Sequence, residues 1–588
     1  MGAAPVTVLR GTEANAAIHN ADFISQWVTL VQGCPYATAF QRPEFVRPWY
    51  SIYRREWEPI VVVARNELEQ ITGLWLLAWN EERRALVHAG AHQAEYHTWL
   101  ARPGSEEPFL EGAWMALKRT FSFKHLSFEY LPHAYLAELL KTTFGRARVW
   151  KGRRPLWRLD PEAIRSSFAK KSNKSRFNRL GRLGSLEFRR ISDRGELERV
   201  IDDLIDFYDF RQGAVHSVMP FRRDALKRDF HLALATTAPE SIILTVTYLA
   251  KRPIAAYWGL ASGGQTHLGM LIHSPFVASH SPGKLHLMQL SEYLSRNGVT
   301  LIDLTPGKDS WKERFANDHD DVASAVLHAS VWYWWRDKIR AHVSRAIGWL
   351  LRMVGATPKG AQAALVRIRR STFRGLVHSG RKWISESREF RVYRAEHALA
   401  MKYVRDPRVQ RNELADLMLL ESTEPGQKQY AFLSTALARL EQGESVSTIR
   451  LHDRLAHYGW TTAQREVFMT EVDQALCLPP CSLLLYDFYS AANGEERELR
   501  GAALAHMVRA AFDDENVRYV YICVSAADDP SRHIIEAMGI GYQGSFHWKR
   551  RFGRVKKWAD VGLTGPSSLS DWGSAVTGDS GLERGNSC

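Results

Sequence analysis

Hydrophobic and polar residues alternate in blocks along residues 1–150, and each block predicts one element. Two apolar runs, 57–66 and 69–80, are joined by a polar turn, which predicts two paired strands. Residues 124–131 alternate in the same way and predict another strand. An aromatic stretch, 40–57, is predicted to be helical in its second half. These residues are expected to form a first domain.

The next block, which extends from near Lys151 to residue 330, changes from helical to strand periodicity and back. A basic stretch at 161–184 predicts one helix, and 196–212 predicts a second, amphipathic helix. Three apolar runs separated by short turns over 241–273 predict an antiparallel meander. A helix that ends before Gly298 and a strand at 299–304 follow. This order predicts a second domain, 151–330, with an α+β layout.

Residues 400–561 are expected to form another α+β domain. Its predicted strands are 416–421, 445–462, 481–490 and 517–526, and its predicted helices are 498–512 and 528–539. The tail, 562–588, is rich in Gly and Ser and is predicted to be disordered. The fold class expected for the chain is therefore α+β, with mixed sheets flanked by helices.

The positive charge of the chain is concentrated in one segment. The 588 residues carry a net charge of +14, and residues 331–400 contain 15 Lys and Arg against 4 Asp and Glu. Within 331–355, four adjacent aromatic residues precede apolar and basic residues at helical spacing. The pattern predicts either a basic helical linker, 331–399, packed on the flanking domains, or a helix on a membrane surface. No nucleic-acid motif accompanies it, so nucleic acid is not an expected partner.

The cysteines and the apolar runs indicate the compartment. Five scattered cysteines favour a reducing compartment over a disulfide framework. The sequence has no run of 18 apolar residues and no convincing secretory signal. Cys477 and Cys481 lack a second pair of ligands, so no metal is expected. The expected location is the cytoplasm, with peripheral contact at the inner face of the membrane through 331–355 as one alternative.

Two Pro-Gly-Lys triplets, Pro282-Gly283-Lys284 and Pro306-Gly307-Lys308, suggest phosphate binding. A nucleotide-binding P-loop needs a Gly five residues before the second Gly, and a Ser or Thr after the Lys. Neither triplet has that earlier Gly, and Asp309 follows Lys308. A nucleoside-triphosphate site is therefore not expected.

The third domain resembles the GNAT superfamily of N-acyltransferases. Its motif is a strand, then Arg500-Gly501-Ala502-Ala503 at an expected helix start, then a strand and a helix that ends at Gly539. In that family the N–H groups at the helix start face the pyrophosphate of coenzyme A. The resemblance implies that Arg500, Gly501 and Ala503 bind the cofactor. Two positions depart from the pattern: Ala503 replaces a Gly, and Ile535 replaces the usual Tyr acid.

The first 330 residues resemble the acyltransferase group of exopolysaccharide and cellulose biosynthesis clusters, which is related to the Fem-type aminoacyltransferases. The shared features are a basic helix at 171–182, Ser281-Pro282-Gly283, and Asp303 to Gly307 followed by Trp-Lys-Glu-Arg-Phe at 311–315. Such proteins look like two GNAT folds in tandem. The resemblance implies that Ser281, Gly283 and Lys284 face the phosphates of an acyl carrier.

Amine acylation needs a neutral amine, a donor to the carbonyl oxygen and a route for one proton. Asp303, at a strand end, could deprotonate the amine or simply cap the next turn. His273 could be a general base or a structural loop residue. Lys284 and Lys312 could bind phosphates or be solvated surface residues. Asp487 could be a catalytic group in a cleft or lie on an exposed face. Arg211 and His216 could line an acceptor site, and Arg211 could otherwise be an ordinary residue at a helix end.

The expected function is N-acyl transfer from a coenzyme A or carrier-protein thioester, such as acetyl-CoA, to a primary amine. The resemblance implies an amino sugar or a lipid-linked precursor as the acceptor. Two alternatives remain open from the sequence. One is a non-enzymatic scaffold of a polysaccharide-synthesis assembly, and the other is a tRNA-dependent aminoacyltransferase whose basic linker contacts RNA.

Overall fold

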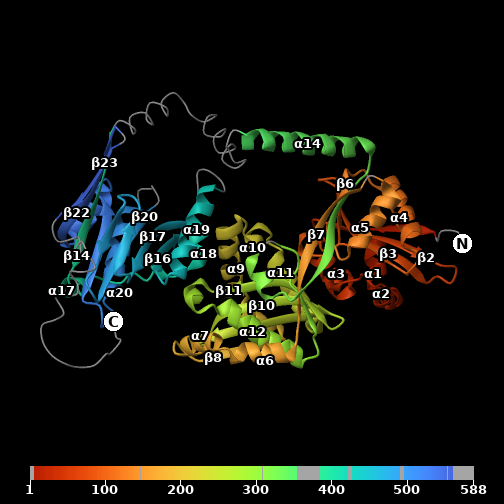
Figure 1. Ribbon diagram of the computed structural model, residues 1–588, viewed down its shortest axis with the longest axis horizontal. Helices are drawn as coiled ribbons and strands as arrows, with labels where there is room; N and C mark the ends of the chain where they lie inside the picture. Colours follow the sequence, from red (N-terminus) through yellow and green to blue (C-terminus); the bar gives the residue numbers. More distant parts are fainter. Residues whose placement is uncertain are drawn as a thin grey trace. The chain divides into compact units, whose positions relative to one another are not determined.

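The computed structural model describes residues 5–145, 147–307, 309–353, 385–420, 427–490, 496–552 and 554–560 (Figure 1). The chain divides into two compact units. The first unit contains residues 1–209 and 219–355, and the second contains 210–218 and 356–588. Both are mixed α/β structures in which helices flank mixed sheets, as expected. The predicted tail, 562–588, lies outside the described residues.

The first sheet of the first unit contains five strands, and helices pack against it (Figure 1). Its strands are β1 (Val6–Arg10), β2 (Glu58–Arg65), β3 (Ile71–Asn80), β4 (Ala85–His88) and β5 (Leu100–Ala101). The helices of this region are α1 (Thr12–His19), α2 (Ala21–Gly33), α3 (Pro43–Tyr53) and α4 (Glu106–Thr120). The apolar runs predicted as strands are β2 and β3, and α4 approaches β3 so closely that a Cβ at Gly73 would lie 2.4 Å from Phe109.

The second sheet of the first unit has eight strands in the order β6-β13-β7-β12-β11-β10-β9-β8. In that order they are His125–Leu131, Asp318–His328, Ala147–Arg158, Leu301–Asp303, Gln265–His273, Arg252–Ser262, Ile242–Leu249 and Leu186–Ile191. All pairs are antiparallel except β11 and β12. The predicted meander is β9 to β11. The strand β7 runs without a break through Lys151, where the second domain was expected to begin.

Ten helices of the described chain accompany this sheet. They are α5 (Ala134–Phe144), α6 (Pro161–Ala169), α7 (Lys171–Gly181), α8 (Arg194–Glu198), α9 (Ile201–His216), α10 (Pro220–Arg223), α11 (Lys227–Thr237), α12 (Pro282–Arg296), α13 (Ser310–Phe315) and α14 (Val331–Met353). The prediction of one helix over 161–184 is wrong. Lys170 has an extended ψ of 127°, which separates α6 from α7, and the amide of Asn173 then donates to the Ser167 carbonyl.

The second unit contains an eight-stranded sheet in the order β15-β16-β17-β20-β21-β14-β22-β23, and a separate hairpin of β18 and β19. The strands are β14 (Ser385–Ala395), β15 (Gln410–Arg411), β16 (Ser445–Leu451), β17 (Arg454–Thr462), β18 (Glu466–Met469), β19 (Gln474–Cys477), β20 (Ser482–Ser490), β21 (Tyr519–Ser525), β22 (Gly541–Arg551) and β23 (Arg554–Ala559). Its helices are α17 (His397–Ala400), α18 (Leu414–Leu417), α19 (Gln427–Glu441), α20 (Glu496–Ala511) and α21 (Asp529–Ala537).

Two expectations for this unit are wrong. The predicted strand at 416–421 begins inside helix α18, because a short apolar run does not distinguish a strand from a buried helical turn. Residues 385–395 are not part of a helical linker but form β14, which pairs with both β21 and β22. The charged residues of β14 made the segment look like a basic linker, although Val392 and Tyr393 are fully buried.

The eight-stranded sheets of the two units share one topology. In each, a single parallel pair (β11 with β12, β20 with β21) lies between antiparallel strands, and one long helix (α12 or α20) connects that pair. The two parallel pairs begin with equivalent backbone hydrogen bonds. Thr300 N donates to Gly264 O at 2.9 Å, and Arg518 N donates to Cys481 O at 2.8 Å. This match aligns the residues of the two sheets one by one.

Among the described residues, no helix is long and apolar enough to cross a membrane.

Candidate active site

The parallel strands β11 and β12 separate after only three residues. They pair from Gln265 with Leu301 to His267 with Asp303, and β11 then continues beside β10 to His273. A bulge at Gly269, where a Cβ would lie 3.0 Å from Trp258 O, marks the separation. Among the described strands, none pairs with the edge of residues 268–273 that faces away from β10. An extended ligand could therefore use this edge for backbone hydrogen bonds.

Helix α12 begins where this free edge ends. Ser281 adopts a left-handed conformation (φ 57°), Pro282 is the first helical residue, and Gly283 is buried. A Cβ on Gly283 would lie 3.3 Å from His273 Nδ1, so the first turn of α12 packs directly on the end of β11. This confirms the sequence-based expectation that Ser281 to Lys284 lie where a strand gives way to a helix.

Basic side chains surround the start of α12. Lys284 Nζ donates to Asn173 Oδ1 of α7 at 2.8 Å. Burial lowers the pKa of Lys284, and the charges of Arg176, Lys170 and Arg314 lower it further. Repulsion among these cations would be relieved by an anion. The first N–H groups of a helix also attract an anion, so this place suits phosphate groups.

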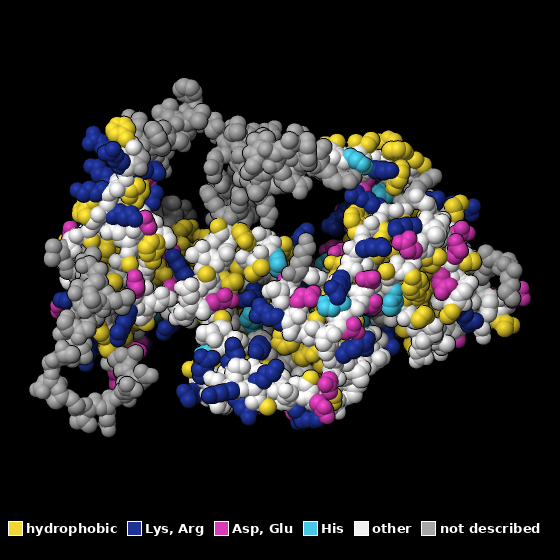
Figure 2. All heavy atoms as spheres, viewed as in Figure 1, with side chains coloured by type: hydrophobic (Ala, Val, Ile, Leu, Met, Phe, Trp, Pro, Cys, Tyr) yellow, Lys and Arg dark blue, Asp and Glu magenta, His cyan; other side chains and the backbone are white. Residues whose placement is uncertain are grey.

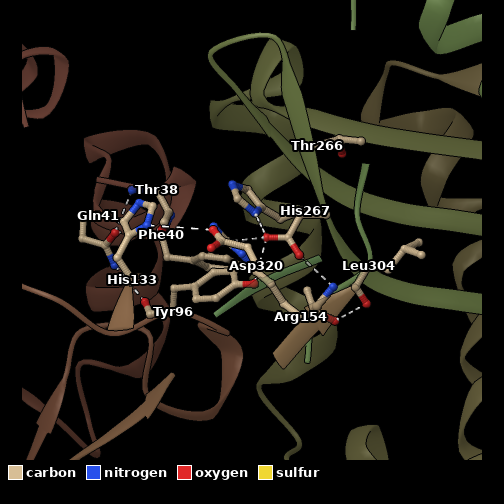
Figure 3. Close-up of polar contacts among 12 residues, drawn as sticks. Thr38, Phe40, Gln41, Tyr96, His133, Arg154, Thr266, His267, Leu304 and Asp320 are labelled. Carbon is tan, nitrogen blue, oxygen red and sulfur yellow. Dashed lines mark hydrogen bonds and ion pairs between the residues drawn. The ribbon is translucent and has the colours of Figure 1, made fainter. Parts of the chain in front are cut away.

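A buried ionic cluster marks the point where β11 and β12 separate (Figure 3). Asp303 Oδ2 accepts from Tyr96 Oη at 2.8 Å and from Arg154 Nη1 at 3.2 Å, and it lies 3.1 Å from His267 Nδ1. Its other oxygen accepts from Thr305 N at 2.8 Å. Asp303 and His267 are each only 1% exposed. The cluster joins three strands, β7, β11 and β12, to the segment before β5.

The partners of Asp303 hold it in the charged form. Burial acts to raise its pKa, but the hydrogen bond and charge of His267, followed by Arg154 and Tyr96, outweigh burial and lower it. Arg154 also donates to Asp320 at 2.6 Å. A carboxylate with this many donors is a weak base, so the geometry favours a positioning role.

A second set of polar contacts fixes the segment that carries Tyr96 (Figure 3). The Gln41 amide donates to Tyr96 O at 2.8 Å, and Gln41 Oε1 accepts from the Thr38 hydroxyl at 2.8 Å. Gln41 and Tyr96 are both buried. Segments that connect the elements around the first sheet therefore contribute directly to the cluster of the second sheet.

Lys312 closes the turn that contains the second Pro-Gly-Lys triplet. Its ammonium donates to the carbonyl oxygens of Thr305 and Pro306 at 3.2 and 3.3 Å, and to the Thr305 hydroxyl at 3.3 Å. It is 6% exposed, and burial lowers its pKa. Lys312 is therefore not the solvated surface residue that was one of its two readings. Lys308 lies outside the described residues.

Glu95 is the acidic residue whose pKa is best placed for catalysis near neutral pH. Burial raises the pKa of Glu95 to about 7, against the nearby charge of Lys312. Glu129 and Asp303 raise it further, and Lys227 lowers it. Its carboxylate forms no hydrogen bond or ion pair with the other residues that the structure describes. Such a group can take up a proton near neutral pH.

Next to Glu95, Lys227 anchors a polar group that joins α11 to the first sheet region. Lys227 Nζ donates to Gln93 Oε1 at 2.7 Å, and burial lowers its pKa to about 8. The Gln93 amide and His92 Nε2 each lie 2.8 Å from Asp224 Oδ2. Asp224 also accepts from Tyr53 Oη at 2.6 Å. The amine of Lys227 and the carboxylate of Asp224 therefore belong to one polar group near Glu95.

The candidate cofactor residues of the second unit lie within a helix, not at its start. Helix α20 begins at Glu496, so the expectation that Arg500-Gly501 opens it is wrong, and the N–H groups beyond its first turn bond within the helix. Arg500 donates to Asp528 at 3.2 Å and to Ser490 at 3.1 Å. Ala503 is fully buried against Val409 and Ile449. Gly501 lines an open groove of about 620 Å³ with residues 402–408.

The other candidates of the second unit are dispersed. Asp487 lies in a bulge of β20 with a φ of 48°, and its side chain is 42% exposed and paired with Arg439, not enclosed in the expected cleft. Arg211 and His216 lie at the end of α9, in the part that clusters with the second unit. Arg211 donates to Glu441 at 2.8 Å, and His216 is exposed.

The shared topology allows a direct comparison of the two sheets. The aligned ladders place Tyr521, Leu484 and Val392 of the second unit where the first unit has Asp303, His267 and Arg154. The second unit therefore has no ionic cluster at the corresponding place within its described residues. Nor do the described parts of the chain contain a group of three or more His, Cys, Asp or Glu residues that could hold a metal ion.

Sequence reasoning found Asp303 and the start of α12 but missed Glu95, Tyr96, Arg154, His267 and Lys227. Several of these residues are far from one another, or from Asp303, in the sequence. Only folding brings them together. One signal was present in the sequence. The segment 88–99 between two strands is dense in His, Glu, Gln and Tyr, which is unusual for a short connection inside a core.

Comparison with known proteins gives one family match. Residues 167–313 match the family model described as an acetyltransferase (GNAT) domain. No curated protein matches the chain.

Several solved structures are also similar to the chain. A tandem GNAT protein from the clavulanic acid biosynthesis pathway is 12% identical, over 55% of this chain and 99% of that chain, with a TM-score of 0.36. FemX is 11% identical, over 51% and 95%, with a TM-score of 0.35. L-PGS from Bacillus licheniformis is 11% identical, over 55% and 96%, with a TM-score of 0.34. The similarity to these structures is therefore remote.

The family match covers part of the candidate site, since Glu95, Tyr96 and Arg154 lie before its first residue. The matched residues include α7, the separating strands β11 and β12, the start of α12, Asp303 and Lys312. Residues 167–313 of the first unit are therefore similar to an acetyltransferase (GNAT) domain.

Proposed function

We propose that the chain is an N-acyltransferase that moves an acyl group from a thioester to a primary amine, and that the first unit does this. The observation that carries the proposal is the opening between β11 and β12. It runs from the cations at the start of α12 to the ionic cluster near Glu95. A long carrier has phosphate groups towards one end and the thioester at the other. The phosphates suit the cations, and the thioester suits the cluster.

In this proposal the donor is an acyl-CoA, such as acetyl-CoA, or an acyl carrier protein. Its phosphates bind at Ser281, Gly283 and Lys284, where Lys170, Arg176 and Arg314 add positive charge. The carrier arm lies along the free edge of β11 and hydrogen-bonds to its backbone. The thioester then lies near the point where β11 and β12 separate. No metal takes part.

Glu95 serves as the general base. The neutral amine nitrogen attacks the thioester carbon and the C–N bond forms, while the carboxylate accepts the proton that the nitrogen loses. The C–S bond breaks, and the thiolate leaves and takes up a proton from solvent. Asp303 is assigned to positioning, because it holds Arg154, His267 and Tyr96 in place. His273 supports the turn at Gly283, and Lys312 supports the turn after Asp303.

The acceptor class is the part of the proposal that rests on sequence resemblance. An amino sugar or a lipid-linked precursor of a cell-surface polysaccharide agrees with the resemblance of residues 1–330. The five scattered cysteines favour the cytoplasm as the location of the protein. The group around Asp224 and Lys227 would contact the acceptor, since it lies beside Glu95.

The second unit is proposed to have no catalytic role. Its helix α20 starts too early to present N–H groups at Gly501, and Tyr521 occupies the place of Asp303. This favours the scaffold reading for that unit. Asp487, Arg211 and His216 then contribute to its structure and not to transfer.

A tRNA-dependent aminoacyl transfer is the second candidate function. The cations around Lys284 suit the phosphates of RNA as well as those of coenzyme A. The two donors are separated by assaying transfer to an amine with acyl-CoA alone and with charged tRNA alone. Activity that depends on charged tRNA would replace the thioester proposal.

Replacing Gly283 by Val is expected to raise the KM for the acyl donor about tenfold or more, because the new side chain meets His273 and disturbs the first turn of α12. Steady-state kinetics with varied acyl-CoA tests this. Gly33→Ala is the matched control, since nothing lies within 4 Å of a Cβ there. An unchanged donor KM in Gly283→Val would contradict the assignment of the donor site.

A further inference from the structure

The N-terminal half of α14 exposes large apolar side chains. Trp332 is 64% exposed, Trp335 52%, Ile339 59% and Val343 51%. Positions separated by three, seven and eleven residues lie on one side of an α-helix. These four side chains therefore form a continuous apolar strip, called here the α14 face. In Figure 2 hydrophobic atoms line the described part of this helix.

Cations border the α14 face and lie over aromatic rings of this face and of the neighbouring Trp334. The Arg336 guanidinium lies 5.0 Å from the Trp332 ring centre, and Lys338 Nζ lies 4.5 Å from that of Trp334 and 5.4 Å from that of Trp335. Arg340 is exposed one turn further along. Apolar residues bordered by basic ones on a single helix suit the boundary between acyl chains and anionic headgroups.

The opposite side of α14 holds it to the first unit. Asp337 Oδ2 accepts from Arg148 Nη1 of β7 at 2.7 Å and lies 3.6 Å from His328 Nε2 of β13. Asp337 is two positions from both Trp335 and Ile339, which places it about 160 to 200° away around the helix axis. The α14 face therefore points away from the sheet to which Asp337 attaches the helix.

We propose that the α14 face is a membrane-docking surface that lies in the interface of an anionic lipid bilayer. Trp332, Trp335, Ile339 and Val343 insert among the headgroups and upper acyl chains, while Arg336, Lys338 and Arg340 contact lipid phosphates. The charge of the partner follows from the bordering cations. Such docking would hold the first unit at a surface that carries lipid-linked acceptors. It deepens the proposed function but does not depend on its chemistry.

The test uses the full chain and vesicles of phosphatidylcholine with and without phosphatidylglycerol. We expect the wild type to float with the phosphatidylglycerol vesicles and not with phosphatidylcholine alone, and we expect raised salt to weaken binding. The double variant Trp332→Ala/Trp335→Ala should bind roughly tenfold or more weakly. Trp558→Ala, which removes an exposed Trp of β23, is the matched control and should bind like the wild type.

Three outcomes would overturn the proposal. They are no flotation of the wild type, equal flotation of wild type and double variant, and a dimer in solution that the double variant abolishes, since the α14 face would then be covered by a second copy. Transfer to a soluble amine separates this proposal from the catalytic one. The double variant should keep that activity, and a wild type without activity that still floats would contradict only the catalytic proposal.

Discussion

Glu95→Gln is expected to reduce acyl transfer roughly 10²- to 10⁴-fold, the usual contribution of a general base. The amide keeps the size of the side chain but cannot accept the proton of the amine. Single-turnover rates at saturating donor measure the effect, because they separate the chemical step from donor binding. The donor KM should stay close to that of the wild type, since Glu95 lies at the other end of the proposed donor site.

The pH dependence gives the same residue a second, independent test. A base works when deprotonated, and burial raises the pKa of Glu95 to about 7. The rate of the wild type should therefore rise as pH increases through about 7 and then level off. Glu129→Gln is the matched control. Because Glu129 raises the pKa of Glu95, this variant should stay active and its rate should rise at a lower pH.

Two results would remove Glu95 from the mechanism. One is a Glu95→Gln variant with near-normal turnover. The other is a variant that is less active but has the same pH profile as the wild type, because that would assign the titrating group to another residue.

Asp303→Asn is expected to destabilise the first unit by about 3 kcal/mol, because it removes one carboxylate from a buried pair and leaves the more exposed Asp320 as the carboxylate that pairs with Arg154. Urea unfolding followed by tryptophan fluorescence measures the loss. Asp320→Asn is the matched control. Its side chain is 38% exposed, so its loss should cost much less.

The sign of the pH dependence distinguishes this explanation from a simple packing defect. The pKa of Asp303 is lowered in the folded state, so its contribution to stability is present above the pKa of the unfolded chain, about 4, and is lost as pH falls below it. The difference between the wild type and Asp303→Asn should therefore shrink in acid. A difference that is the same at neutral pH and at low pH would contradict the ionic explanation.

Most elements of the fold were predictable from the sequence where the apolar residues followed one regular spacing. The apolar runs of β2 and β3 and the meander β9 to β11 have such patterns, and all were predicted correctly. The prediction of secondary structure failed where the charged residues of a segment concealed the period of its apolar residues. β14 looks basic because its exposed residues are Arg and Glu, although Val392 and Tyr393 fill the core. In 161–184 no helix-breaking residue marks the break at Lys170, which is accompanied by a hydrogen bond from Asn173 to the Ser167 carbonyl.

The candidate site was predictable only in part, for a physical reason. The start of α12 follows from local rules, since Pro282 at the first position and Gly283 against a strand end can be read in one stretch. Glu95 and Lys227 could not be found that way. Their pKa values are set by burial and by charges from distant segments, and these exist only in the folded unit.

The same limit applies to the second unit. Its Arg-Gly-Ala-Ala sequence resembles a cofactor motif, yet the start of α20 at Glu496 places these residues inside the helix. A motif indicates a binding site only when the helix begins at it, and the sequence alone did not fix that start. The shared topology adds what the motif lacked, because it identifies Tyr521 as the counterpart of Asp303.

Calorimetric titration of coenzyme A into the full chain and two variants, Gly283→Val and Gly501→Val, locates the donor site. We predict one binding site per chain, lost or strongly weakened in Gly283→Val and retained in Gly501→Val. Binding that survives Gly283→Val but not Gly501→Val would move the donor site to the second unit and contradict the account.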